Sequence, residues 1–579
     1  MKPVFVLIAV FVLVSSRSAS SGAGSRFHFV DATNESGLSS FRHLSGNPRD
    51  KRYILEVMSG GVAIFDYDND GLPDVYLVNG STLDVLRGKA KPDQAAKSRL
   101  YHNLGKGKFE DVTEGAGVGN PGRWGMGACA ADYDNDGRTD LFVTNAFSRN
   151  MLYHNNGDGT FSEMSGKAAI GGPPGHWSTG CAWADYDNDG YVDLFVAGYV
   201  DLDLNNLPDP GTNQFCRYRG LPVNCGPRGL KGAGDYLYHN NGNGTFTEVS
   251  TKAGVDDKSG YYGLGCVWAD FDNDGLIDLY VANDSTPNFL YHNNGNGTFN
   301  DIAFDMGAAV NEDGREQASM GVDAEDYDGD GYFDIFTTNF VDDYSTLYHN
   351  EAGKQFSDVS NQAGLAAPGW NFLKWGTGFV DFDNDGRPDV FVANGHIYPE
   401  IEGKGFGQTF GQRNQLFENL GDGRFGEVRE ETLDKVIRVS RGAAFADLDG
   451  DGRVDVVINN LDDQPTVMLN HSLSGHWIAL KLVGRTSNRD AIGARVMITA
   501  GGKKQVAEVR AGHSYLSQSD LKLHFGLGTS NKIDAIEIRW PRGGAQKLSD
   551  VSADQVLRIE EQTTQRKRGE QLQRPVKPF

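Results

Sequence analysis

The stretch GCAWADYDNDGYVDLFVAG, residues 180–198, contains the pattern that decides the fold. An apolar segment leads into the motif D-x-D-x-D-G-x-x-D, and a segment rich in β-branched and aromatic residues follows it. Segments of this composition favour β-strands, and a glycine at the centre of the motif permits a sharp bend. The stretch therefore predicts two strands joined by an acidic turn.

The same pattern returns seven times along the 579 residues. The motifs begin, at intervals of 66, 53, 85, 56, 55 and 66 residues, at Asp66, Asp132, Asp185, Asp270, Asp326, Asp381 and Asp447. A period near 55 residues with insertions in the loops is typical of a β-propeller. The 75 glycines of the chain agree with a fold that has many tight turns.

A second repeated phrase follows the first six acidic turns. It reads LYHN in five copies and LFEN in the sixth, beginning at Leu100, Leu152, Leu237, Leu290, Leu347 and Leu416. Glycine-rich turn residues and a phenylalanine come next, which is a hairpin pattern. Each unit therefore contains four strands, the composition of one propeller blade.

The last unit indicates how the ring closes. No F-x-D-V-T phrase follows TVMLN at residues 466–470, but FVDATNESGL, from Phe29, matches FEDVTEGAGV, from Phe109. We expect the N-terminal strand to complete the seventh blade and to leave no open sheet edge. The predicted fold is all-β, with a seven-bladed propeller over residues 25–473.

The C-terminal part has no acidic turn. Alternation of apolar and polar residues in WIALKLVG and DAIEIRW predicts a small β-sandwich of five to seven strands over residues 474–560. We expect it to pack on the rim of the propeller. Residues 561–579 are polar and basic, and we expect a disordered tail there.

The N-terminus has the composition of a signal peptide, which we assign to residues 1–20. Lys2 precedes an apolar run of about eleven residues, and small residues follow. Since a membrane span needs about 20 apolar residues, this run is too short to be one. We expect a secreted protein, or a periplasmic or cell-surface protein if the source is bacterial, and no membrane span.

The charge of the chain excludes one class of partner. Asp and Glu number 78 and Lys and Arg 54, so the formal net charge is -24. Binding of nucleic acid needs clustered cations. The carboxylate excess instead predicts that cations are supplied from outside.

The acidic turns predict metal sites. Carboxylates at positions 1, 3, 5 and 9 converge, and the backbone carbonyl at position 7 adds an oxygen, a set that favours Ca²⁺ over the more hydrated Mg²⁺. We predict up to seven Ca²⁺ ions, one per blade, which act as structural staples. The predicted ligands are Asp66, Asp68, Asp70 and Asp74; Asp132, Asp134, Asp136 and Asp140; Asp185, Asp187, Asp189 and Asp193; Asp270, Asp272, Asp274 and Asp278; Asp326, Asp328, Asp330 and Asp334; Asp381, Asp383, Asp385 and Asp389; Asp447, Asp449, Asp451 and Asp455.

The five cysteines fall into two groups. Cys216 and Cys225 lie in the Pro- and Gly-bearing loop FCRYRGLPVNCGP, and we predict a disulfide between them. Cys129, Cys181 and Cys266 occupy like positions shortly before a repeated Asp. We interpret these three as strand residues that face a core, rather than as metal ligands or catalytic thiols.

The repeats resemble FG-GAP or VCBS repeats, the calcium-bearing blades also found in integrin α-subunit propellers. GHWIALKLVG, AIGARVMI, SYLSQSDLKLHFGLG and IEIRWPRGG, from Gly475, Ala491, Ser514 and Ile536, resemble an ASPIC/UnbV domain. The combination, over residues 27–560, resembles the cartilage acidic protein family. That resemblance implies an exported calcium-binding protein, and adhesion or matrix roles are proposed for animal members.

Two functions from different classes agree with these observations. The first is a non-catalytic binding or adhesion module for an extracellular protein or glycan. The second is a calcium-dependent carbohydrate-active enzyme, a polysaccharide lyase or hydrolase, which would need one asymmetric cluster of Arg, His, Tyr and carboxylates at a propeller mouth. No Ser-His-Asp, P-loop, HExxH or dinucleotide signature occurs, and the histidines of LYHN repeat once per blade as structural residues do. We therefore favour binding and assign no catalytic residue.

Some aromatic and arginine residues stand outside the repeat. We expect them near the mouth of the central channel, because they lead into the first strand of each blade. Such side chains can stack on sugars or hold carboxylates, and ordinary loop packing is the alternative. They are Arg123, Trp124, His176, Trp177, Tyr261, Tyr262, Arg315, Glu316, Trp370, Trp375, Arg438 and Arg441.

Overall fold

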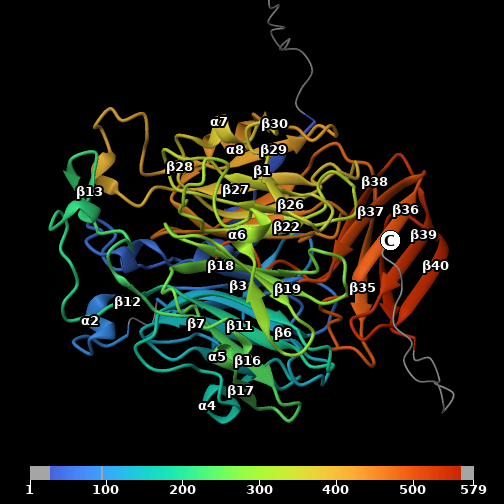
Figure 1. Cartoon of the computed structure of the whole chain (residues 1–579), viewed down its shortest axis with the longest axis horizontal. Helices are drawn as coiled ribbons and strands as arrows, with labels where there is room; N and C mark the ends of the chain where they lie inside the picture. The colour runs from blue at the N-terminus through green and yellow to red at the C-terminus, as the bar shows by residue number, and fades with distance from the viewer. Residues whose placement is uncertain (1–25, 93–95, 563–579) are drawn as a thin grey trace, which may run out of the picture.

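The computed structural model describes residues 26–92 and 96–562. Seven four-stranded antiparallel sheets form the blades of a propeller, and a two-sheet sandwich lies against one of its faces (Figure 1). The first strands of successive blades contact one another in the order β2, β6, β10, β18, β22, β26 and β32, and β32 contacts β2 again. The ring is therefore closed, and the predicted seven-bladed propeller is confirmed.

The blades share one order of strands, from the channel outward. Blade 1 has β2 (Val62–Phe65), β3 (Asp74–Leu77), β4 (Arg99–Asn103) and β5 (Phe109–Asp111); blade 2 has β6 (Trp124–Ala131), β7 (Asp140–Ala146), β8 (Met151–Asn155) and β9 (Phe161–Glu163). Blade 3 has β10 (Ser178–Ala184), β11 (Asp193–Gly198), β16 (Tyr236–Asn240) and β17 (Phe246–Glu248); blade 4 has β18 (Gly263–Ala269), β19 (Asp278–Asn283), β20 (Phe289–Asn293) and β21 (Phe299–Asp301). Blade 5 has β22 (Val322–Glu325), β23 (Asp334–Thr337), β24 (Thr346–Asn350) and β25 (Phe356–Asp358); blade 6 has β26 (Lys374–Val380), β27 (Asp389–Asn394), β29 (Gln415–Asn419) and β30 (Phe425–Val428). Blade 7 has β32 (Ser440–Ala446), β33 (Asp455–Asn460), β34 (Thr466–Asn470) and β1 (Phe29–Asp31).

The N-terminal strand completes blade 7, as predicted. β1 pairs antiparallel with β34, so that Phe29 lies opposite Asn470 and Asp31 lies opposite Met468. The Phe29 side chain is fully buried, and its ring lies 5.5 Å from that of Phe382. This strand, β1, which we call the clasp, therefore covers the edge of β34 and also adds apolar contacts to blade 6.

Helices are short and lie between the larger elements. Seven of them come directly after the fourth strand of a blade or close behind it: α1 (Thr33–Ser36), α3 (Thr113–Ala116), α4 (Ser165–Ala168), α5 (Ser250–Ala253), α6 (Ala303–Met306), α7 (Ala366–Gly369) and α8 (Glu431–Lys435). α2 (Leu83–Leu86) lies in a loop, with the short strands β12 (Val200–Asp201), β13 (Arg217–Tyr218), β14 (Leu221–Pro222), β15 (Lys231–Gly232), β28 (Gln412–Arg413) and β31 (Ile437–Arg438) in the inserted segments. In the part of the chain that the structure describes, no helix has the length and apolar character of a membrane span.

The C-terminal strands form the sandwich. One sheet has the order β38 (Leu523–Gly528), β35 (His476–Val483) and β41 (Gln555–Glu560); the other has β37 (Lys503–Glu508), β36 (Arg495–Ala500), β39 (Lys532–Arg539) and β40 (Ala545–Ser552). Its buried residues, such as Ile498 and Ile536, belong to one apolar cluster with Trp183 of the propeller. The two parts therefore share a core.

The sandwich also fills the central channel of the propeller. Residues 511–520, which we call the plug, leave the sandwich and enter the ring of inner strands. We expected only rim packing, so this insertion is a correction. Hydrogen bonds join the plug to the inner strands of six blades, at Val62, Ala130, Trp183, Val322, Thr377 and Phe445.

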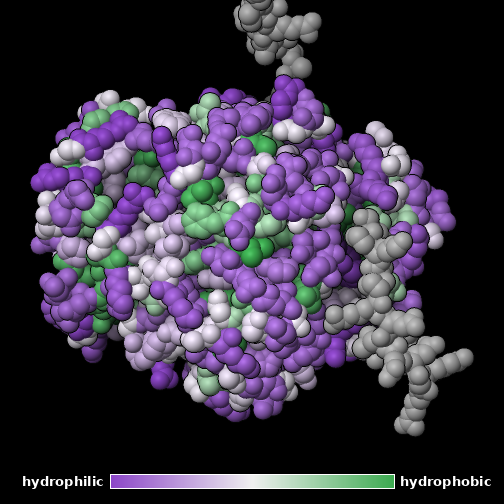
Figure 2. All heavy atoms as spheres, viewed as in Figure 1, coloured by the Kyte–Doolittle hydropathy of each residue, from purple (hydrophilic) through white to green (hydrophobic). Residues whose placement is uncertain are grey.

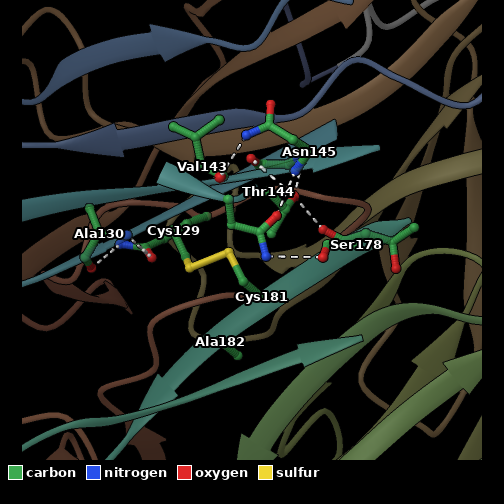
Figure 3. Close-up of a disulfide and its surroundings, with 12 residues drawn as sticks. Cys129, Ala130, Val143, Thr144, Asn145, Ser178, Cys181 and Ala182 are labelled. Carbon is green, nitrogen blue, oxygen red and sulfur yellow. Dashed lines mark hydrogen bonds between the residues drawn. A yellow bond between two sulfur atoms is a disulfide. The ribbon is translucent and has the colours of Figure 1, made fainter. Parts of the chain in front are cut away.

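Two disulfides cross-link the structure, and one of them was not predicted. Cys216 and Cys225 pair as expected. Cys129 and Cys181, which we had interpreted as separate core residues, also pair and join the inner strands of blades 2 and 3 (Figure 3). Their Cα atoms lie 6.0 Å apart because adjacent blades place like positions side by side. Cys266 is buried with a free thiol.

Two predicted terminal segments lie mostly beyond the described residues. The signal peptide assigned to residues 1–20 falls entirely outside them, as do residues 563–579 of the predicted tail. Glu561, which we had placed in that tail, is buried and accepts hydrogen bonds from the backbone N–H groups of Arg485, Thr486 and Ser487. The ordered sandwich therefore extends one residue or more past the predicted boundary.

Candidate metal centres in the acidic loops

Each acidic loop joins the first and second strands of its blade and is bent by its own carboxylate. In blade 3, Asp185 accepts hydrogen bonds from the N–H groups of Asp189, at 2.9 Å, and Gly190, at 3.0 Å. Asn188 and Gly190 adopt positive φ angles of 57° and 98°. The bond from the position 6 glycine to the position 1 Asp recurs in all seven blades. The motif therefore specifies its own bend.

The position 9 carboxylate fixes the loop to the rest of the blade. Asp193 accepts the N–H of Tyr186 at 3.3 Å and the N–H of Asn240, from LYHN, at 2.8 Å. The equivalent pair of bonds occurs at Asp74, Asp140, Asp278, Asp334, Asp389 and Asp455. Both repeated phrases of the sequence thus meet at one buried carboxylate.

A histidine also faces the acidic loop in five blades, although its repetition in LYHN indicated only a structural residue. His239 Nδ1 lies 3.2 Å from Asp193 Oδ1 and 3.5 Å from Asp187 Oδ2. In the sequence, the histidine is marked only by its fixed position in LYHN, directly before the Asn whose N–H donates to the position 9 Asp. Ligand atoms from positions 3 and 5 and this histidine lie within 4.8 Å of one another in five groups: Asp68, Asp70 and His102; Asp134, Asp136 and His154; Asp187, Asp189 and His239; Asp272, Asp274 and His292; Asp328, Asp330 and His349.

The electrostatics of the loops favour a bound cation. Burial, reinforced by neighbouring carboxylates, raises the pKa of Asp185 to about 8 and that of Asp326 to about 8. Oδ1 of Asp66 and of Asp270 is buried without a hydrogen-bond partner. Such oxygens cost free energy unless a cation or a donor meets them. The residues present therefore fit a divalent ion with oxygen ligands, since Ca²⁺ takes six to eight of these.

The sandwich covers the face that carries the loops. Lys481 Nζ lies 3.0 Å from Asp66 Oδ2, and Arg539 pairs with Asp270. Asp490 accepts the backbone N–H of Asp132 at 2.7 Å. The loops of blades 1, 2 and 4 are thus in direct contact with C-terminal residues, and so are those of blades 5 and 6, through Arg495 and Gly475. Order in the loops and docking of the sandwich are therefore coupled.

Five of the twelve residues expected at the channel mouth are buried in the packing instead: Trp124, Trp177, Tyr262, Trp375 and Arg441. Arg315, Glu316 and Trp370 are exposed, and the other four are half-buried. Trp124, Trp177 and Trp375 are fully buried. Arg441 is also buried, with its guanidinium carbon 4.1 Å from the centre of the Trp375 ring, and donates hydrogen bonds to backbone carbonyls. The plug residue Tyr515 stacks edge-on against Trp375 at 4.7 Å. The alternative of ordinary packing therefore holds at the buried positions.

An open group of aromatic and arginine side chains lies elsewhere, on the disulfide-bearing insertion. The label β13 lies at the end of the propeller opposite the sandwich strands (Figure 1). Tyr218 donates to Asp342 at 2.8 Å, and the guanidinium of Arg219 lies 5.2 Å from the centre of the Phe406 ring. Phe215 is 38% exposed. We call Phe215, Tyr218, Arg219 and Phe406 the platform.

Comparisons with known proteins agree with this architecture. The FG-GAP-like repeat model matches residues 66–143, 132–196, 229–281, 270–337, 326–392 and 406–458, more than half of the chain, and the ASPIC and UnbV model matches residues 484–566. Cartilage acidic protein 1 of Xenopus tropicalis is 27% identical over 533 residues, which cover 83% of this chain and 70% of the relative. The Homo sapiens protein of that name is 26% identical over 516 residues, which cover 83% and 69%. The BP39L lectin of Burkholderia pseudomallei has 8% identity and a TM-score of 0.43, covering 71% of this chain and 96% of the lectin, a likeness that carries no argument about function.

Proposed function

Because the chain belongs to the FG-GAP repeat proteins that carry an ASPIC and UnbV domain, we propose that it is a secreted calcium-binding propeller. It acts as a non-catalytic binding or adhesion module for an extracellular protein or glycan. The observation that supports this most is the repetition of one acidic loop geometry in every blade. Repeated equal sites are what structural ions need, whereas a catalytic site is needed once. The two disulfides suit an oxidising compartment.

Calcium in this proposal stiffens the molecule. The carboxylates at positions 1, 3, 5 and 9 and the carbonyl at position 7 would hold the ion in a calcium-binding loop, and the ion would neutralise carboxylates that burial otherwise protonates. The loops in turn support the sandwich through Lys481 and Arg539. Loss of calcium would therefore loosen both domains together.

The platform is the surface that we propose for the partner. Aromatic rings and guanidinium groups supply large contact areas and stack on sugars or hold carboxylates. Trp370, 47% exposed, lies next to it, because its backbone carbonyl accepts the N–H of Asp342, the residue that pairs with Arg219. Figure 2 shows apolar groups among hydrophilic ones at this end of the propeller.

The carbohydrate-active enzyme remains the second interpretation. Two of the residues that would have built its site at the channel mouth are buried instead: Trp375 packs on the plug residue Tyr515, and Arg441 lies over Trp375. This arrangement leaves them poorly placed to meet a polysaccharide. We therefore keep binding as the proposed function.

A direct test uses the full chain on arrays of glycans and matrix proteins, with calcium and with chelator. We expect binding that needs calcium and that is lost when Phe215 and Arg219 are replaced by Ala. Replacing Arg558, which lies on the outer strand β41, by Ala should leave binding unchanged and serves as the control. Turnover of a polysaccharide by the purified protein would contradict the proposal.

A further inference from the structure

The acidic loop of blade 6 differs from the other loops in what faces it. The position that LYHN gives to histidine holds Glu418, and the guanidinium of Arg26 enters from the N-terminal segment. Arg26 Nε lies 2.8 Å from Asp383 Oδ2, and Nη2 lies 2.6 Å from Glu418 Oε1 and 3.6 Å from Asp385 Oδ2. One side chain thus contacts positions 3 and 5 of the loop together with the residue that replaces histidine.

Arg26 contacts a position 3 carboxylate that is more buried than its counterparts in the five blades with a histidine. The position 3 side chains of blades 1 to 5 are 25–31% exposed. The corresponding side chain of blade 6, Asp383, is 3% exposed. Its other oxygen, Oδ1, has no hydrogen-bond partner, so the ion pair with Arg26 is what balances this buried charge.

The backbone of the clasp holds Arg26 in place. Leu473 donates its N–H to the carbonyl of Arg26 at 2.9 Å, and His471 donates to the carbonyl of His28 at 2.8 Å. These bonds continue the pairing of β1 with β34 to the N-terminal side. The guanidinium is therefore a tethered cation whose position depends on a formed clasp.

Arg387, the arginine inside the blade 6 loop, does not explain why this loop differs from the others. Arg387, at position 7 of blade 6, pairs with Asp385 and donates to the carbonyl of Asn419. Arg138 and Arg453 make the equivalent contacts in blades 2 and 7. At the blade 2 loop, Arg489 donates its backbone N–H to Asn135 Oδ1, and its guanidinium donates to the carbonyl of Gly484. Among these three blades, blade 6 is the one in which an arginine side chain from outside the loop pairs with the position 3 carboxylate.

We propose that Arg26 occupies the blade 6 loop in place of a calcium ion and fastens the N-terminal clasp there. The inference rests on the proposed calcium binding of the other loops. Calcium needs carboxylate oxygens at 2.3–2.6 Å. In blade 6 the guanidinium of Arg26 faces Oδ2 of both Asp383 and Asp385, at positions 3 and 5. The cations at blades 1 and 4, Lys481 and Arg539, instead contact position 1 of their loops. Blade 6 thus carries an internal ion pair where its neighbours carry an exchangeable ion.

The test counts calcium ions bound to the full chain by equilibrium dialysis and elemental analysis. Arg26→Gln removes the charge and should raise the count by one relative to the wild type. Adding Asp383→Asn to Arg26→Gln should return the count to the wild-type value, which assigns the gained ion to blade 6. Arg42→Gln, a surface arginine paired with Asp463 outside the acidic loops, is the matched control and should not change the count.

The outcomes separate this inference from the proposed function. Seven ions in the wild type, or an unchanged count in Arg26→Gln with thermal stability retained, would overturn the role of Arg26 and leave calcium binding intact. If Arg26→Gln unfolds, the number of calcium ions bound to the wild type decides the question. Seven ions would be incompatible with a blade 6 loop that is occupied by Arg26. Absence of bound calcium from every variant would overturn both proposals.

Discussion

Replacing the plug residue Tyr515 by Ala should destabilise the whole propeller. Tyr515 is fully buried, stacks on Trp375 and donates its hydroxyl to the carbonyl of Met58 at 2.5 Å. Replacing a buried aromatic residue by Ala costs about 3–5 kcal/mol, and the unpaired carbonyl adds about 1–3 kcal/mol. We therefore expect Tyr515→Ala to lower the free energy of unfolding by about 4–8 kcal/mol. Tyr515→Phe keeps the ring and should cost about 1–3 kcal/mol, since it leaves only the carbonyl unpaired.

The assay is denaturant unfolding of the full chain at fixed calcium, followed by tryptophan fluorescence. Val556→Ala is the control, because Val556 lies in the sandwich, is 54% exposed and does not belong to the plug. Its unfolding midpoint should match that of the wild type. Wild-type stability of Tyr515→Ala would refute the reasoning that the C-terminal segment braces the ring from inside.

Four further changes address the ring and its loops. Chelation of calcium should lower the melting temperature strongly, because ligand binding stabilises the folded state, and a melting curve unaffected by chelator would count against structural ions. Asp187→Ala should remove one bound ion while the other loops keep theirs; loss of all calcium would show that the blades are not independent. Deleting residues 29–33 should open the ring and expose the edge of β34, and a deletion variant as stable as the wild type would disprove the clasp. Replacing Cys129 and Cys181 by Ser should cost about 2–4 kcal/mol in unfolding experiments, and equal stability at the same calcium concentration would argue that this disulfide constrains little.

Much of the fold could be predicted because the sequence repeats the same turn motif and flanking strand patterns. The acidic motif specifies a bend through its own glycine and carboxylates, and seven copies with flanking strands leave few architectures other than a propeller. The clasp was also predictable, because the strand missing after residues 466–470 has its match at Phe29. Prediction succeeded where the information lies within one repeat or in the comparison of two repeats.

The features that were missed depend on contacts between blades or between domains. Nothing near Cys129 signals Cys181, 52 residues away, until neighbouring blades bring their inner strands together. The plug comes from the C-terminal domain, so Trp375, which was expected at an open channel mouth, instead packs against Tyr515. Arg26 meets Asp383 only after the ring has closed. A local pattern cannot contain such information.

The most direct test of the account is a crystal structure of the full chain with calcium, with data collected at a wavelength where calcium scatters anomalously. We expect anomalous peaks inside the acidic loops of blades 1 to 5 and 7, at about 2.3–2.6 Å from the carboxylate oxygens, and the Arg26 guanidinium without a peak in blade 6. Acidic loops that carry no calcium peak in any blade would contradict the central claim that these carboxylates bind the ion.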